Sequence, residues 1–320
     1  FRRVLFRSIE TELNTLSQEY GSIVGQQMIT YNGEEITMPI AATYLKNPDA
    51  AIRQEVYELI VNRRVVDREK LDELFTKLVQ LRHQSAVNAG CKDYRDYKFL
   101  SLGRFDYSVQ DCLDFHESVA THIVPLAKQI AQLQADKLGK TKLKPWDSDV
   151  DPDGKEPLKP FNNGEELLAG SIKMFDQLDP YFGSCLQTMQ KEGYLDLDSK
   201  PGKSPGGYNY PLYESGIPFI FMNAAGAQQD LVTMVHEGGH AVHSFLSRDL
   251  ALTAFKSLPS EVAELASMSM ELITMDLWNE FYNDENDCMR AKREQLESIV
   301  KVLPWIATID AFQHWIYTHP

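Results

Sequence analysis

Through most of this chain, apolar residues recur every three or four positions, which is the spacing of amphipathic helices. The first predicted helix covers residues 9–20, and a longer helical stretch runs from about residue 49 to residue 88, where Gly90 ends it. Further helices are predicted over residues 108–138, 164–177, 180–192 and 260–273. After residue 273 the helical pattern continues to about residue 316, with a break at 283–286. The pattern predicts a mainly α-helical protein.

One of these helices carries a clear start signal. Ser108 and Asp111 have the spacing of a capping box, in which each residue satisfies a free backbone N–H of the first turn. His116 and His122 lie within the helix that follows, and we interpret both as structural histidines.

Two stretches have the pattern of β-strands. In residues 28–38, Asn32 and Gly33 stand between β-prone runs, which predicts a hairpin. Residues 217–222 read as another strand, and Pro218 predicts that it lies at the edge of its sheet. Such an edge can bind an extended peptide through main-chain hydrogen bonds, although an ordinary core strand is the alternative. We expect a small sheet within the helical fold.

Two stretches have the composition of loops. Residues 200–216 are rich in Gly, Pro and Ser and contain Tyr208 and Tyr210, which are placed to line a substrate site. Residues 144–154 contain four aspartates but lack the glutamate at position twelve of an EF-hand calcium loop. We therefore interpret that stretch as a polar connector.

The composition indicates a globular protein that does not bind nucleic acid. Of the 320 residues 43% are hydrophobic, and the net charge of −14 would repel a phosphate backbone. No stretch is long and apolar enough to span a bilayer, so we expect no membrane partner. The cysteines are scattered without a C-x-x-C pair, which predicts buried free thiols in a reducing, cytoplasmic compartment: Cys91, Cys112, Cys185 and Cys288.

The candidate chemistry lies in the H-E-x-x-H motif formed by His236, Glu237 and His240. On a helix the two histidines stand one turn apart on one face and can bind one zinc ion, with Glu237 as the general base. A solvated helix face is the alternative. Against it, the flanking residues are apolar, so unpaired His and Glu would be buried at a cost. Gly238 and Gly239 in mid-helix cost helix stability, which makes sense if something must approach the backbone closely.

A third ligand is expected from the helix predicted over residues 260–273, with Ser260 as its N-cap. This helix offers the carboxylates of Glu261, Glu264 and Glu271, and spacing alone does not choose among them. Glu264 and Glu271 share a helix face, so one could bind the metal while the other holds a ligand in place.

These motifs together resemble a known family, the oligoendopeptidase F branch of the thimet-oligopeptidase-like metallopeptidases. The resemblance is carried by residues 236–240 with 259–271, and it extends through 208–211, 217–223 and 309–320. Members of that family usually have a bulkier residue where this chain has Gly238.

The resemblance implies a helical zincin-type metallopeptidase with a small β-sheet beside the active site. Carried over by position, it implies one zinc ion per chain, bound by His236, His240 and Glu264, with Glu237 as the base. Further residues are candidates for supporting a ligand or for contacting substrate: Glu271, His243, Tyr208 and Tyr210.

The implied function is zinc-dependent hydrolysis of internal bonds in short oligopeptides. These peptides are the expected partners. The sequence does not indicate an oligomeric state. One alternative is a zinc carboxypeptidase or peptidyl-dipeptidase, although the sequence identifies no cation to hold a terminal carboxylate. The other alternative is a non-catalytic helical peptide-binding protein with a structural zinc. A structural site has no need of a base such as Glu237, and it usually fills its fourth position with a protein ligand.

The expected organisation has three parts. Residues 1–8 are basic and resemble a translated sequencing adapter. Residues 9–65 are the end of an N-terminal helical region and contain the hairpin. Residues 66–320 form the catalytic domain. The chain stops inside a family motif, so we expect a C-terminal truncation. In relatives, the following segment carries His and Tyr residues that stabilise the tetrahedral intermediate, and a fragment without them is expected to be a poor enzyme.

Overall fold

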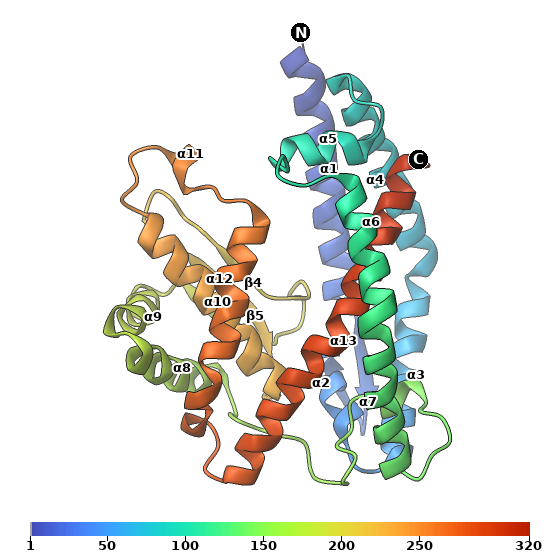
Figure 1. The fold of residues 1–320 in the computed structure, drawn as a ribbon, viewed down its shortest axis with the longest axis vertical. Helices are drawn as coiled ribbons and strands as arrows, with labels where there is room; N and C mark the ends of the chain where they lie inside the picture. The colour runs from blue at the N-terminus through green and yellow to red at the C-terminus, as the bar shows by residue number, and fades with distance from the viewer. Residues whose placement is uncertain (1) are drawn as a thin grey trace.

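The computed structural model describes residues 2–320, with side chains from Ser8 onward. Most of the segment 1–8 expected to be an adapter therefore lies outside the described side chains. The chain is mainly helical with small sheets, which confirms the predicted fold class (Figure 1). The longer helices are α1 (Arg2–Gly25), α3 (Ala50–Val66), α4 (Arg68–Ala89), α6 (Val109–Ser118), α7 (Val124–Lys137), α8 (Gly164–Leu178), α9 (Pro180–Glu192), α10 (Gln228–Ser247), α12 (Ser260–Ile273) and α13 (Glu285–Thr318).

The elements form two groups that α13 connects. On one side of Figure 1, α1 packs along α4, and α6 and α7 pack against α13, which also contacts α4. On the other side, α10 lies among α8, α9 and α12 with the larger sheet, and α13 crosses from this group to the first. Short elements complete the chain: α2 (Met38–Thr43), η1 (Tyr44–Lys46), α5 (Tyr94–Ser101), η3 (Pro145–Asp147), α11 (Thr253–Lys256) and η4 (Met275–Glu280).

The predicted hairpin is present as β1 (Met28–Tyr31) and antiparallel β2 (Glu34–Thr37). Asn32 and Gly33 form the turn with φ values of 54° and 83°, the positive angles that a tight hairpin turn requires. The hairpin packs its buried side chains against α3, which gives this end of the molecule a small hydrophobic core of its own.

The predicted helices discussed next are present, but the structure differs from the prediction in local details. Ser108 and Asp111 form the predicted capping box, and the helix they open includes a π-helical segment, η2 (Val119–Ile123). The stretch 49–88 is two helices rather than one, because the chain turns at Asp67. Ser260 is the first residue of α12 and not its N-cap. Pro259 takes that place, and no side chain caps the helix.

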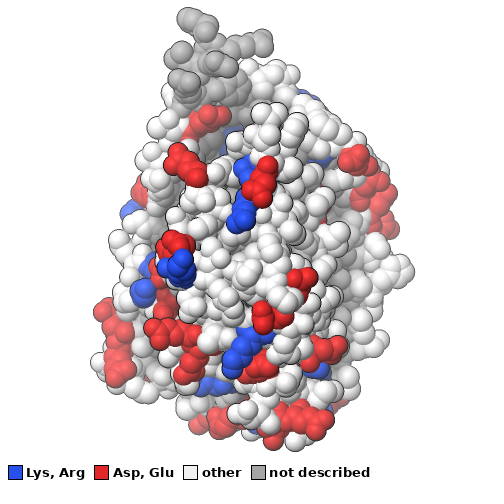
Figure 2. Space-filling model, turned by 90° about the vertical axis from the view of Figure 1, so that its left-hand side faces the viewer, with Lys and Arg blue, Asp and Glu red and all other residues white. Residues whose placement is uncertain are grey.

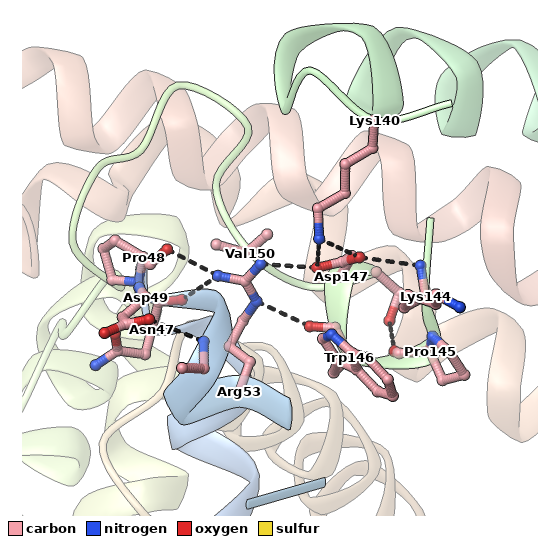
Figure 3. A network of polar contacts seen from close by, with 12 residues as sticks. Asn47, Pro48, Asp49, Arg53, Lys140, Lys144, Pro145, Trp146, Asp147 and Val150 are labelled. Atoms are coloured by element: carbon pink, nitrogen blue, oxygen red, sulfur yellow. Dashed lines mark hydrogen bonds and ion pairs between the residues drawn. The ribbon is translucent and has the colours of Figure 1, made fainter. Parts of the chain in front are cut away.

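The aspartate-rich stretch, predicted to be a polar connector, also anchors α3 through buried charged groups. Asp147 and Arg53 are both fully buried, with 2.7 Å between Oδ1 and Nη2, and Lys140 Nζ lies 2.6 Å from the same carboxylate (Figure 3). The Arg53 guanidinium also donates to the carbonyl oxygens of residues 47, 48 and 146. Because the Arg53 guanidinium and the Asp147 carboxylate both have hydrogen-bond partners, this buried pair holds α3 against the connector.

The larger sheet corrects the prediction of an edge strand at residues 217–222. Its order is β3 (Leu195–Asp198), β5 (Phe219–Ala224), β4 (Tyr208–Tyr210), so β5 is central. Pro218 precedes the strand and takes no part in its hydrogen bonding, which is why it does not force β5 to the edge. The edge beside α10 is β4, within the stretch that was predicted to be a loop.

The main hydrophobic core surrounds α10. Leu231, Met234, Val235 and Ala241 on this helix are completely buried, and they pack with residues of α8, α9, β5 and α13. The cysteines are free thiols as predicted. Cys185 and Cys288 are buried, but Cys91 and Cys112 are only partly so, which corrects the expectation of four buried thiols.

The surface is acidic on the face shown in Figure 2, where Asp and Glu gather along the lower edge and Lys and Arg lie scattered. Among the described residues, no helix combines the length and apolar character needed to cross a membrane.

The Arg53–Asp147 pair gives a testable prediction about stability. Asp147→Asn should lower the free energy of unfolding at neutral pH by about 2–4 kcal/mol, because Arg53 is left buried without a counter-charge. Burial by itself raises the pKa of Asp147, but Lys140 and Arg53 outweigh it and hold that pKa below its usual value. The unfolded chain therefore takes up the proton first as the pH falls, and the difference between variant and wild type should shrink below about pH 4.

Chemical denaturation at several pH values measures this difference. Asp153→Asn is the matched control, because Asp153 pairs with Lys137 on the surface, where both side chains are nearly half exposed. A loss in the control as large as that in Asp147→Asn, or a loss that does not vary with pH, would contradict the assignment.

Candidate metal centre

Helix α10 presents its polar residues from within the core. It begins where the Asp230 carboxylate accepts hydrogen bonds from the backbone N–H groups of Ala225 and Ala227, at 2.8 and 2.9 Å. These bonds satisfy backbone donors around the start of the helix. The surrounding core then fixes the rotation of the helix, so that His236 and His240 point toward α12.

The structure brings together His236, His240 and Glu264. The Nε2 atoms of the two histidines lie 3.2 and 3.7 Å from the two carboxylate oxygens of Glu264, and one donor atom of each residue lies within 4.8 Å of the others. Two ligands of one tetrahedral zinc ion are about 3.3 Å apart when the bonds are ~2.0–2.1 Å long. The separations of Glu264 from the two histidines are therefore close to those around one zinc ion.

Close contact between α10 and α12 creates this arrangement. A Cβ atom on Gly239 would lie 2.9 Å from the Ser267 Cα, so only glycine lets the two backbones approach this closely. On another side of α10, a Cβ on Gly238 would lie 2.7 Å from the Phe175 ring. The prediction that these glycines admit a close neighbour is confirmed, and in both cases the neighbour belongs to the protein itself.

Glu271 contacts the other ring nitrogen of His236. Its Oε1 is 2.7 Å from the Nδ1 atom of His236, and its Oε2 accepts a hydrogen bond of 2.7 Å from Gln295 on α13. Burial by itself lowers the pKa of His236, but Glu271 and the other nearby carboxylates outweigh burial and raise it. A proton on Nδ1, shared with Glu271, leaves Nε2 free to bind a metal. The remaining candidate, Glu261, points away and bonds to Arg104 and Tyr107.

Glu237 is the most buried carboxylate of the cluster, with an exposed fraction of 6%. Its pKa is raised to about 7, chiefly by burial; His236 opposes the rise, the nearby Glu264 adds to it, and the backbone N–H of Asn209 opposes it. Among the described residues, its Oε2 has no hydrogen-bond partner. A buried carboxylate oxygen without a partner is costly, which indicates that a water or a substrate proton belongs there.

The three other candidate residues lie near the cluster in different ways. His243 lines a cavity of about 280 Å³ that also contacts His240, and its Nδ1 has no partner within the described part of the chain. Tyr208 and Tyr210 are about half exposed on β4, and Tyr208 stacks on Phe221 with 4.9 Å between ring centroids. Because side chains alternate along a strand, the tyrosines lie on the face of the sheet opposite Asn209.

The sequence interpretation missed the residues that support the site from other elements. Asn209 borders the same cavity as His240, and Gly207 lies so close that an added Cβ would be 3.6 Å from Glu237 Oε1. Gln295 follows Glu271 by 24 positions along the chain. No spacing rule links these residues to the motif, although a glycine next to the two tyrosines was a signal of close approach.

The charge of the cluster fits a cation. Three carboxylates, those of Glu237, Glu264 and Glu271, surround two imidazoles in a partly buried position, so the cluster is negative unless it holds a positive ion. Burial, and after it the neighbouring His236, lowers the pKa of His240, which keeps that imidazole neutral and able to act as a ligand. Two neutral imidazoles and one carboxylate are a common donor set for catalytic zinc.

Known proteins resemble this chain over most of its length. The profile of Peptidase family M3 matches residues 43–320. Among curated proteins, oligoendopeptidase F (chromosomal) of Lactococcus lactis subsp. cremoris is 31% identical over 107 residues, 33% of this chain and 18% of that protein. The group B oligopeptidase PepB of Streptococcus agalactiae is 23% identical over 261 residues, 79% of this chain and 41% of that protein.

A solved structure extends the match to the fold. Pz peptidase A in complex with an inhibitor superposes with a TM-score of 0.92 and 29% identity, over 97% of this chain and 55% of that one. The chain thus spans about half the length of the solved relative that it matches, and less of the two curated ones.

The two glycines of the motif give a paired prediction. Gly239→Ala should weaken zinc binding by about 10–100-fold, because the added methyl group pushes α12 and Glu264 away from the two histidines. Gly238→Ala should lower the free energy of unfolding by about 1–3 kcal/mol through its clash with Phe175 and leave zinc affinity near that of wild type. Competition with a chromophoric chelator measures affinity, and denaturation measures stability. Equal losses of affinity in the two variants would show that helix separation is not the cause.

Proposed function

The chain belongs to Peptidase family M3, a metallopeptidase family, and we propose that its His–Glu cluster is the centre of a zinc-dependent endopeptidase acting on short oligopeptides. The proposal assigns His236, His240 and Glu264 as ligands of one zinc ion and Glu237 as the general base. Residues 66–320 are proposed to contain this catalytic unit.

The observation that carries the proposal is the placement of Glu264 across the two histidines. Its carboxylate oxygens face both Nε2 atoms at 3.2 and 3.7 Å, while its side chain remains half exposed. A structural zinc site is normally closed by four protein ligands, but this cluster offers three ligands and an open side. That difference favours catalysis over the alternative of a peptide-binding protein with structural zinc.

The zinc ion and the residues around it have separate roles in the proposed reaction. Zinc supplies Lewis acidity, which makes water a stronger nucleophile near neutral pH and polarises the scissile carbonyl. Glu237 takes a proton from the attacking water at its unpartnered Oε2 and returns it to the leaving amine. Burial raises the pKa of Glu237 to about 7, which suits a group that must both accept and release a proton at neutral pH. Glu271 and Gln295 keep His236 in the tautomer that presents Nε2.

The peptide is proposed to bind along β4. This strand ends the order β3-β5-β4, so its outer edge has backbone groups available for an extended peptide. The backbone N–H of Asn209 helps to lower the pKa of Glu237, so the base lies beside this strand. The names of the relatives, oligoendopeptidase and oligopeptidase, support a short peptide as substrate.

A second candidate, cleavage close to the carboxyl terminus of a peptide, gains support from the cavity next to His240. Arg248 and Lys256 line this cavity together with His243, and cationic groups of this kind can bind a terminal carboxylate. The sequence interpretation did not identify them, because they lie on either side of a loop and no motif marks them. The ammonium of Lys256 is already engaged, since it donates to the Arg248 carbonyl at 2.6 Å.

The ligand assignment is tested by metal binding alone. Glu264→Gln should lose zinc or bind it much more weakly, whereas Glu271→Gln should retain zinc with an affinity reduced by about 10–100-fold, because Glu271 only orients His236. Metal analysis after dialysis against a series of chelator concentrations separates the two variants. Full zinc occupancy in Glu264→Gln, with loss in Glu271→Gln, would exchange their roles.

The catalytic proposal is tested by Glu237→Gln in the complete gene product, since this chain spans about half the length of its solved relative. The variant should keep zinc but lose at least ~10²-fold in kcat, because proton transfer loses its acceptor. Quenched fluorescent peptides with a free and with an amidated carboxyl terminus are the substrates. Equal cleavage of both forms supports an endopeptidase, and dependence on the free carboxylate supports the second candidate. Normal turnover by Glu237→Gln would refute the role of base.

A further inference from the structure

A second cluster of metal-ligand side chains lies away from the first, where α13 crosses α6. Helix α6 carries Cys112 and His116 four positions apart, and α13 carries Asp310 and His314 with the same spacing. Residues four apart project from one face of a helix, so each helix presents two such side chains to the other. The two helices are in contact, as the crossing of α13 in Figure 1 shows.

The distances within this cluster are those of a metal site before the ion is added. Cys112, Asp310 and His314 each offer a ligand atom, and the three atoms lie within 4.8 Å of one another. The carboxylate of Asp310 stands between the two histidines: its Oδ2 is 2.6 Å from His116 Nε2 and 3.4 Å from His314 Nε2. The contact with His116 is a short hydrogen bond, whereas the others are separations that one shared ion can close.

The cluster is sheltered from water on one side. His314 is only 8% exposed, and its Nδ1 has no hydrogen-bond partner among the described residues. Cys112 is half-buried. An ion bound at His314 Nε2 would leave this Nδ1 unchanged, so the case for a metal rests on the separations among the three ligand atoms.

Charged groups of both signs lie around the cluster. Asp310 contacts both histidines directly, whereas Arg104 pairs with Glu261 at 3.1 Å. Arg95 lies 3.6 Å from Asp96, and its buried Nε has no hydrogen-bond partner among the described residues. A metal ion can displace the thiol proton, as happens when cysteine becomes a ligand.

We propose that Cys112, Asp310 and His314 bind a second divalent metal ion of the zinc class, with His116 holding the Asp310 carboxylate in position. A thiolate, an imidazole and a carboxylate suit zinc or a similar borderline-soft ion and do not suit calcium or magnesium, which prefer oxygen ligands alone. Hydrogen bonding of an outer residue to a ligating carboxylate is the usual support in such sites.

The proposed ion would tie the last part of α13 to the group of helices that contains α6. The first part of α13 reaches the first cluster through Gln295, which donates to Glu271. The last part packs on the other group, where Phe312 stacks on Phe75 and Tyr317 contacts Tyr94. An ion between α6 and α13 fixes the second half of the long helix, so its removal should loosen the chain without removing a ligand of the first site.

Cobalt(II) is the probe, because a cobalt–thiolate bond gives charge-transfer absorption that the sulfur-free first cluster cannot produce. Metal-free wild-type protein should take up two equivalents of Co²⁺ per chain and develop this absorption. Cys112→Ser and Asp310→Asn should each bind one equivalent, without the thiolate absorption in Cys112→Ser. His240→Ala should lose the other equivalent and keep the absorption.

Cys91→Ser is the matched control, since Cys91 is also a free and partly exposed cysteine. It should behave as the wild type does. Zn²⁺ should also raise the melting temperature of His240→Ala but not that of the double variant with Cys112→Ser. The proposal is overturned if wild-type protein shows no thiolate absorption, if the absorption persists in Cys112→Ser, or if it disappears in Cys91→Ser.

Discussion

The candidate metal centre depends on the close approach of α10 and α12 at Gly239. The histidines belong to one helix and the third ligand to the other, so the distance between the two backbones sets the separation of Glu264 from both histidines. With no side chain at Gly239, the Ser267 backbone lies against α10, and the Glu264 carboxylate reaches both Nε2 atoms. The core around α10 resists any rotation that would turn the histidines away, because close-packed interiors yield little.

Helix α13 relates this centre to the rest of the molecule. Its first part supports the cluster through Gln295 and Glu271, and its Arg290 forms a buried pair with Asp151 at 2.9 Å. Its last part lies among the helices of the other group and brings Asp310 and His314 to α6. Any change that shifts this one helix therefore acts on both groups. The Arg53–Asp147 pair holds the connector that contains Asp151, so it stabilises the same arrangement from the opposite end.

Local signals in the sequence predicted the elements that depend on local physics. Asn32 and Gly33 specified the hairpin because few other residues accept positive φ at both positions. The capping box at Ser108 and Asp111 satisfies backbone donors within a single turn, so neighbouring residues suffice to identify it. The same local reasoning failed at β5, because whether a strand is central or at an edge depends on which strands pair with it, and the residues of the strand itself do not encode that pairing.

The sequence by itself determined the helical fold class, the family resemblance and the two histidines with Glu237, because a spacing of four on a helix fixes their common face. It left Glu261, Glu264 and Glu271 as equal candidates by spacing, and only the resemblance selected Glu264. The tertiary structure placed Glu264 across both histidines and Glu271 behind one of them. It also supplied Asn209, Gln295 and the cluster at Cys112, which no motif joins. Their positions follow from how separate elements pack, and the distances between packed elements are not encoded in any single stretch of chain.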